Sequence, residues 1–166
     1  MSGVITADPH GSAGWCATQD EHLAAQSAAR LLITAATGVR VETIARRIHA
    51  ASSRTMLPFV CTSAYDWPSD PALLRATWTH CVDAAQGGSL LMNDIELLAP
   101  FVQDQLIEVL EELQLARTPA SDVRLVSGTT VLLFHRVGEG RFSERLFYLL
   151  NVLHVVADDA SNHGLS

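Results

Sequence analysis

Short hydrophobic segments and longer amphipathic segments alternate along the chain. Apolar runs of the length of a buried strand occupy residues 31–33, 57–62, 89–92, 122–127 and 152–156. Helical spacing or composition marks residues 21–30, 41–51, 72–85, 101–115 and 142–150. The clearest helical signal lies at 101–115, where Val102, Leu106 and Leu110 share one face and acidic residues lie on or near the other. The pattern therefore predicts strands that alternate with helices.

Strand–helix alternation of this kind is typical of βαβ units, which build a parallel sheet with helices on both faces. We predict an α/β fold with a five-stranded, mostly parallel sheet. Ligands bind such sheets at the carboxyl ends of the strands, here the turn 34–40 and the pairs Asn93–Asp94 and Thr129–Thr130. The domain is predicted to span 21–156, between a flexible N-terminal arm (1–20) and a polar C-terminal tail (157–166).

The same periodicity predicts where several side chains lie. In helix 41–51, Arg46 and Arg47 should face solvent. The apolar face of helix 72–85 should comprise Leu73, Leu74, Trp78 and Val82. Cys61 and Cys81 should be buried as small apolar residues, and His49 should pack in the core instead of binding a ligand.

Composition narrows the classes of function. With 166 residues, 48% of them hydrophobic, the chain predicts one folded domain with a sizeable core. The net charge of −7 gives no cationic footprint for nucleic acid, so no direct DNA binding is expected, and it also disfavours an anionic membrane surface. No apolar run is long enough to span a bilayer. The N-terminal residues lack the basic region and the continuous apolar region of a signal peptide, so none is expected. Three widely spaced cysteines indicate reduced thiols, hence a cytoplasmic protein.

Four segments together resemble a known family. They are IARRIHAASSRTMLPFV at 44–60, GGSLLMNDIELL at 87–98, DVRLVSGTT at 122–130 and RFSERLFYLLNV at 141–152. In this order and spacing they resemble the AAA+ ATPase domain of bacterial enhancer-binding proteins, the sigma-54-interacting transcription activators. The likeness runs from about residue 27 to residue 156. It implies a three-layer, P-loop NTPase-like α/β subdomain and a role in transcription regulation.

The family's phosphate loop, GxxxxGK, is degenerate in this chain. The resemblance places its first Gly on Ala35, its last Gly on Arg40 and its Lys on Val41, while Gly38 is kept and Glu42 follows. Such a loop needs inward-pointing backbone N–H groups and an ammonium on the β- and γ-phosphates. Valine supplies no charge, and an arginine adds a long side chain where a small residue is required.

The remaining catalytic positions are altered as well. The Asp-Glu pair that holds magnesium and orients the attacking water falls on Asn93 and Asp94. A neutral Asn is a poor ligand for a hard cation, and Asp is one methylene shorter than Glu. The polar sensor falls on Thr130, and the two finger arginines fall on Ser143 and Leu149. We therefore expect neither catalytic residues nor a metal site, since no His or Cys residues have metal-ligand spacing.

Two larger parts of the family pattern are not found. The family inserts a GAFTGA loop, which grips the sigma factor, between the second and third strands. Residues 62–86 contain no such motif and look too short for it. The sequence ends soon after the fifth strand, so we expect neither the helical lid of AAA+ proteins nor a DNA-binding helix-turn-helix.

These losses favour a catalytically inactive domain that binds another protein or itself. No cofactor is expected. A residual nucleotide-binding switch without hydrolysis is the alternative, because Gly38 is kept near a helix N-terminus with Arg40 beside it, and its ligand would be ATP or ADP. A product without a selected role is a third interpretation.

Overall fold

A computed structural model describes residues 18–116 and 122–157 of the chain. A five-stranded sheet forms the centre, in the order β2-β3-β4-β1-β5. Its strands are β1 (Leu31–Thr34), β2 (Phe59–Ser63), β3 (Ser89–Asn93), β4 (Arg124–Thr129) and β5 (Leu153–Val156). Every neighbouring pair runs parallel. The predicted five-stranded α/β sheet is therefore confirmed.

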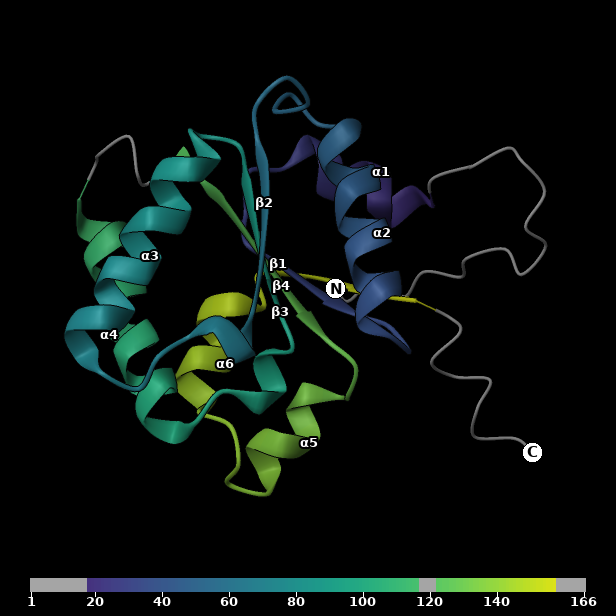
Figure 1. Cartoon of the computed structure of the whole chain (residues 1–166). Coiled ribbons are helices and arrows are strands. Elements are labelled where there is room, and N and C mark those ends of the chain that lie inside the picture. The colour runs from purple at the N-terminus through teal and green to yellow at the C-terminus, as the bar shows by residue number, and fades with distance from the viewer. Residues whose placement is uncertain (1–17, 117–121, 158–166) are drawn as a thin grey trace, which may run out of the picture.

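Helices cover both faces of this sheet (Figure 1). They are α1 (Gln19–Gln26), α2 (Gly38–Ala50), α3 (Pro71–Ala85), α4 (Pro100–Leu115), α5 (Leu133–Gly138) and α6 (Glu144–Leu150). Two 3-10 helices follow β2 and β3, at Ala64–Asp66 and Ile95–Leu97. Helices α1 and α2 pack on one face of the sheet, and α3, α4 and α6 pack on the other.

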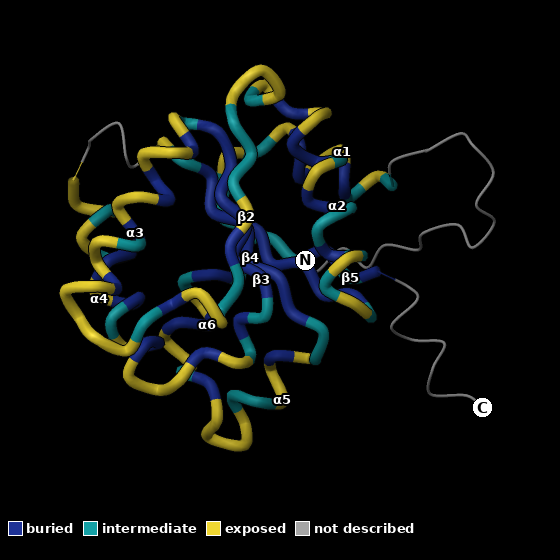
Figure 2. The backbone as a smooth tube through the Cα atoms, viewed as in Figure 1, coloured by how far each residue is buried: buried dark blue, intermediate teal, exposed yellow. Residues whose placement is uncertain are grey.

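Two apolar cores result, one on each face of the sheet. Strands β1, β3 and β4 are buried at every position, which Figure 2 shows in dark blue, because helices cover them on both sides. The edge strands β2 and β5 are only partly buried. His49 lies in this interior, where its Nε2 donates to the Leu57 carbonyl and its Nδ1 accepts from Ser89 Oγ at 2.9 Å. The prediction that His49 is a packing residue is confirmed.

Side-chain caps fix the first residues of helices α2 and α3. Thr37 caps α2, and Asp70 caps α3, whose first residue is a proline. The α3 helix ends at Gln86 in the left-handed conformation. Two residues later, a side chain at Gly88 would overlap the Pro58 carbonyl. Only glycine at this position therefore lets β3 start beside residue 58.

Several predicted elements differ in extent from those observed, among them helix 21–30, which ends at Gln26, and strand 122–127, which spans Arg124–Thr129. The turn predicted at 34–40 is shorter, because Thr37 caps α2 and the helix starts at Gly38, three residues before the predicted start. Helix α5 was not predicted, since its six residues are too few to show a helical period.

Three predicted side-chain placements are wrong. Leu73 is 60% exposed, because Leu74, Trp78 and Val82 already fill the inward stripe of α3. Cys61 is exposed on the edge strand β2, whereas Cys81 is buried as expected. Arg47 does not face open solvent: it donates to Glu21 Oε1 of α1 at 2.6 Å, and its side chain is 21% exposed.

The folded body extends past the predicted domain limits at both ends. Thr18 caps α1, so Gln19 and Asp20 are helical and not part of the arm. Ala157 is buried, and its N–H donates to the Thr34 carbonyl at 2.9 Å. The rest of the predicted arm and tail, 1–17 and 158–166, lies outside the described residues. Within the part that is described, no helix is both long and apolar enough to cross a membrane.

Candidate functional site

The turn between β1 and α2 contains only Ala35, Ala36 and Thr37. Thr37 Oγ1 accepts from the Arg40 N–H at 3.1 Å, and the Thr37 carbonyl accepts from the Val41 N–H at 3.1 Å. Both N–H groups are therefore used inside the helix. Ala35 is buried, with its N–H on the Thr129 carbonyl of β4 at 3.1 Å. The turn is thus a tight capped helix start and not a wide loop around a ligand.

Val41 fills the space beside this turn. Its side chain is fully buried in the core beneath α2. A Cβ added at Gly128 of β4 would overlap Val41 Cγ1 and would lie 2.7 Å from Asn93 Oδ1. The valine therefore fits only because residue 128 has no side chain. An apolar group packed in this way offers no charge to an anion.

Asn93 joins the end of β3 to the first turn of α2. Its Nδ2 donates to the Gly38 carbonyl at 3.2 Å, and its Oδ1 accepts from the Asp94 N–H at 3.1 Å. The amide can fill both roles because it carries a donor and an acceptor, whereas an ionised carboxylate only accepts. Asparagine at position 93 therefore links the end of β3 to the start of α2, where the resemblance places a metal-holding aspartate.

The other polar groups at this edge of the sheet are engaged with neighbouring side chains. Asp94 has a left-handed backbone (φ 57°), and its Oδ2 accepts from Ser63 Oγ of β2 at 2.9 Å. Thr130 Oγ1 donates to Glu96 Oε1 at 3.1 Å. Asp94 is thus held by the end of β2, and Thr130 is held by the 3-10 helix that follows β3.

Arg40 and Glu42, the remaining two residues of the predicted phosphate loop, also lie on α2. Arg40 is partly buried in the first turn. Glu42 accepts from Arg46 one turn later at 2.8 Å, and the Arg46 guanidinium lies 4.6 Å from the centre of the Phe59 ring. The structure thus brings together Gly38, Val41 and Asn93, while Glu42 and Thr130 are bonded elsewhere.

Titratable groups near the site do not form a metal centre. Thr34 Oγ1 lies 2.9 Å from His154 Nε2, and burial lowers the pKa of His154, so this ring is neutral at pH 7. Burial, with Glu42 as the next cause, raises the pKa of the Cys61 thiol and thus keeps it protonated. Across residues 18–116 and 122–157, no three His, Cys, Asp or Glu side chains are grouped to hold a metal ion.

Sequence reasoning missed Ser63, Glu96 and Gly128. A glycine inside a buried strand signals a close approach of another group, so Gly128 had a readable signal. Ser63 and Glu96 had none, because their roles depend on which strand ends are neighbours in the sheet.

The strand order and the strand–turn–helix at the carboxyl end of β1 define the class: this is an α/β domain of the P-loop NTPase type. The family model of the Sigma-54 interaction domain matches residues 18–157. The chain therefore belongs to the Sigma-54 interaction domain family, which confirms the resemblance seen in the sequence.

The curated relatives include transcriptional regulatory proteins. The chain is 34% identical to the transcriptional regulatory protein XylR of Pseudomonas putida, over 84% of this chain and 28% of XylR. It is 31% identical to the regulatory protein AtoC of Escherichia coli, over 80% of this chain and 32% of AtoC. The chain thus spans about a third or less of these two regulators.

Solved structures agree in fold. NtrX from Brucella abortus, in complex with ATP, superposes with a TM-score of 0.69 at 29% identity, over 83% of this chain and 35% of NtrX. The P-loop NTPase domain of a sigma-54 transport activator from E. coli gives a TM-score of 0.59 over 83% of this chain and 97% of that one. Its 18% identity supports the fold alone.

Proposed function

We propose that this chain is a catalytically inactive Sigma-54 interaction domain that acts in transcription regulation by binding another protein. It would neither hydrolyse ATP nor need it. The observation that carries the proposal is the position of Val41, fully buried over Gly128 at the place of the phosphate-binding lysine. The Asn93–Gly38 hydrogen bond supports it, since it occupies the place of the magnesium ligand.

The surface formed by α5 and α6 supports a protein partner. Leu132, Phe134 and Tyr148 are 52%, 63% and 61% exposed. Phe147 lies between the two aromatic residues, with ring centres 6.1 Å from Phe134 and 5.4 Å from Tyr148. Exposed aromatic side chains that are held by their neighbours are typical of protein interfaces. The partner would be an active member of the same family or a second copy of this chain.

Residual nucleotide binding without hydrolysis is the second candidate. It rests on the N-terminus of α2, where Gly38 starts the helix and the helix dipole favours an anion. The closed turn weakens this candidate, because the N–H groups of Arg40 and Val41 are already bonded to Thr37.

Association is measured by light scattering of the whole chain, alone and mixed with the active Sigma-54 interaction domains of the same bacterium. We expect a self-associated or mixed complex that the double variant Phe134→Ser/Tyr148→Ser weakens by about tenfold or more, since two apolar anchors are lost. Leu23→Ser is the matched control, because Leu23 is 56% exposed on α1, a helix that lies away from α5 and α6 (Figure 1). A strictly monomeric chain without a complex in any mixture would refute the proposal.

A further inference from the structure

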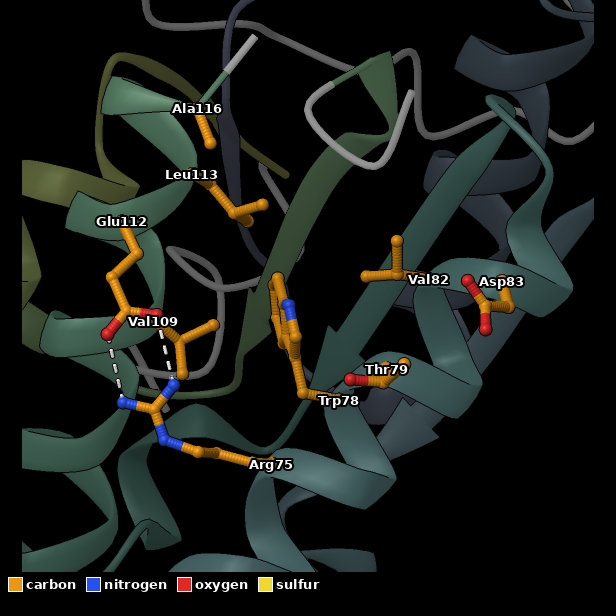
Figure 3. A pocket seen from close by; sticks show the side chains of 9 residues that line it. All are labelled: Arg75, Trp78, Thr79, Val82, Asp83, Val109, Glu112, Leu113 and Ala116. Carbon is orange, nitrogen blue, oxygen red and sulfur yellow. Dashed lines mark hydrogen bonds and ion pairs between the residues drawn. The ribbon is translucent and has the colours of Figure 1, made fainter. Parts of the chain in front are cut away.

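A groove separates α3 from α4 on the face of the sheet opposite α2 (Figure 3). Its volume is about 240 Å³. The residues that line it are Arg75, Trp78, Thr79, Val82, Asp83, Val109, Glu112, Leu113 and Ala116. None of them belongs to the candidate site at the strand ends.

The floor of the groove is apolar and firmly supported. Trp78, Val82 and Val109 are at most 7% exposed, so core contacts hold them in place. The Trp78 ring also packs on the Trp67 ring, with 6.0 Å between the ring centres. A dry cavity of about 150 Å³ accommodates a benzene molecule, so this groove has room for one leucine or phenylalanine side chain.

The rim of the groove is acidic. The Arg75 guanidinium donates to both carboxylate oxygens of Glu112 at 3.0 Å (Figure 3). It also lies 3.6 Å from Glu108. Asp83 lines the groove on the α3 side. Among the described residues that line the groove, Arg75 is the one cation, and it is shared between Glu112 and the nearby Glu108, while Asp83 adds further negative charge.

The two helices also concentrate the negative charge of the chain. Residues 71–85 and 100–115 carry five carboxylates, Asp83, Asp104, Glu108, Glu111 and Glu112, against one guanidinium. These helices thus hold four of the seven net negative charges of the chain. A partner that carries Lys or Arg beside an apolar residue complements both the floor and the rim.

We propose that the groove between α3 and α4 binds a cationic amphipathic helix of a partner protein. One bulky apolar side chain of that helix enters the groove against Trp78, and its flanking Lys or Arg residues lie on the Glu112 and Asp83 rims. The inference rests on the proposed function as a protein-binding domain and adds a surface separate from α5 and α6.

The probe is an 18-residue helical peptide with lysines on one face and a single phenylalanine amid alanines on the other. A second peptide, identical but with alanine in place of phenylalanine, measures charge attraction alone. We expect the phenylalanine peptide to bind the whole chain at least about tenfold more tightly, because it buries one apolar anchor. Methyl NMR signals of Val82, Val109 and Leu113 should shift with that peptide. Equal affinities, or shifts confined to other methyl groups, would overturn the proposal.

A pair of variants on α3 separates a filled groove from a misfolded one. Thr79 is exposed and lines the groove, whereas His80 is exposed and does not. Thr79→Trp should fill the groove and lower the affinity for the phenylalanine peptide by about tenfold. The affinity of His80→Trp for the same peptide should stay within about twofold of that of the unchanged chain. If both variants bind the phenylalanine peptide equally well, the groove is not its binding site. The light-scattering experiment on the surface of α5 and α6 tests the proposed function separately.

Discussion

At the scale of single residues, Val41, Gly128 and Asn93 form one packed unit. The valine fills the volume that a side chain at position 128 would need, and the Asn93 amide closes the turn by donating to Gly38. Each substitution is unremarkable alone, since valine, glycine and asparagine are common in cores and turns. Together they explain why the turn has the shape of a capped helix start.

The complementarity of Val41 and Gly128 is tested by Gly128→Ala. The added methyl overlaps Val41 Cγ1, so we expect the free energy of unfolding to fall by about 1–3 kcal/mol, as measured by urea denaturation. Gly138→Ala is the matched control, because nothing lies within 4 Å of a Cβ added there. Adding Val41→Ala should make the double variant more stable than the sum of the two single losses. Strict additivity would show that the two residues do not compete for the same space.

At the scale of the elements, the sequence predicted the five strands and every α-helix of the described residues except the six-residue α5, while the exact limits of several elements differ. Strands β1, β3 and β4 carry a clear pattern because they are buried at every position, and helices α3 and α4 because one face of each is buried. The start of α2 was missed because the family resemblance suggests a loop there, whereas the Thr37 cap favours helix. The exposure of Cys61 followed from the position of β2 at the edge of the sheet, which no local pattern encodes.

Helix α1 is joined to α2 by the ion pair of Glu21 and Arg47. Glu21 is 4% exposed, so Glu21→Gln replaces a buried, charge-assisted hydrogen bond to Arg47 with a weaker neutral one. We expect a loss of about 1–3 kcal/mol in urea denaturation, with faster amide hydrogen exchange concentrated in α1. Glu42→Gln breaks an exposed pair on the same helix and should cost about 0.3–0.5 kcal/mol. Equal effects of the two variants would contradict a structural role for the buried pair.

At the scale of the whole molecule, the family fold is kept, and we propose that its ligand site is closed. Helices still cover both faces of the sheet, and the TM-score of 0.69 with NtrX reflects that framework. The sequence predicted the framework, and the family resemblance led us to expect altered positions at the site. It did not predict that Val41 and Asn93 would close the turn, because that depends on the spacing between β3, β4 and α2.

We propose, as the central claim, that the turn between β1 and α2 does not take a nucleotide, because Val41 and Asn93 pack against it. Its most direct test is calorimetric titration of Mg-ATP into the whole chain, with the NtrX protein that was crystallised with ATP as the positive control. We predict no saturable heat for this chain up to about 1 mM ATP, a concentration at which even weak binding is detectable. A saturable one-to-one heat in the micromolar range would contradict the claim.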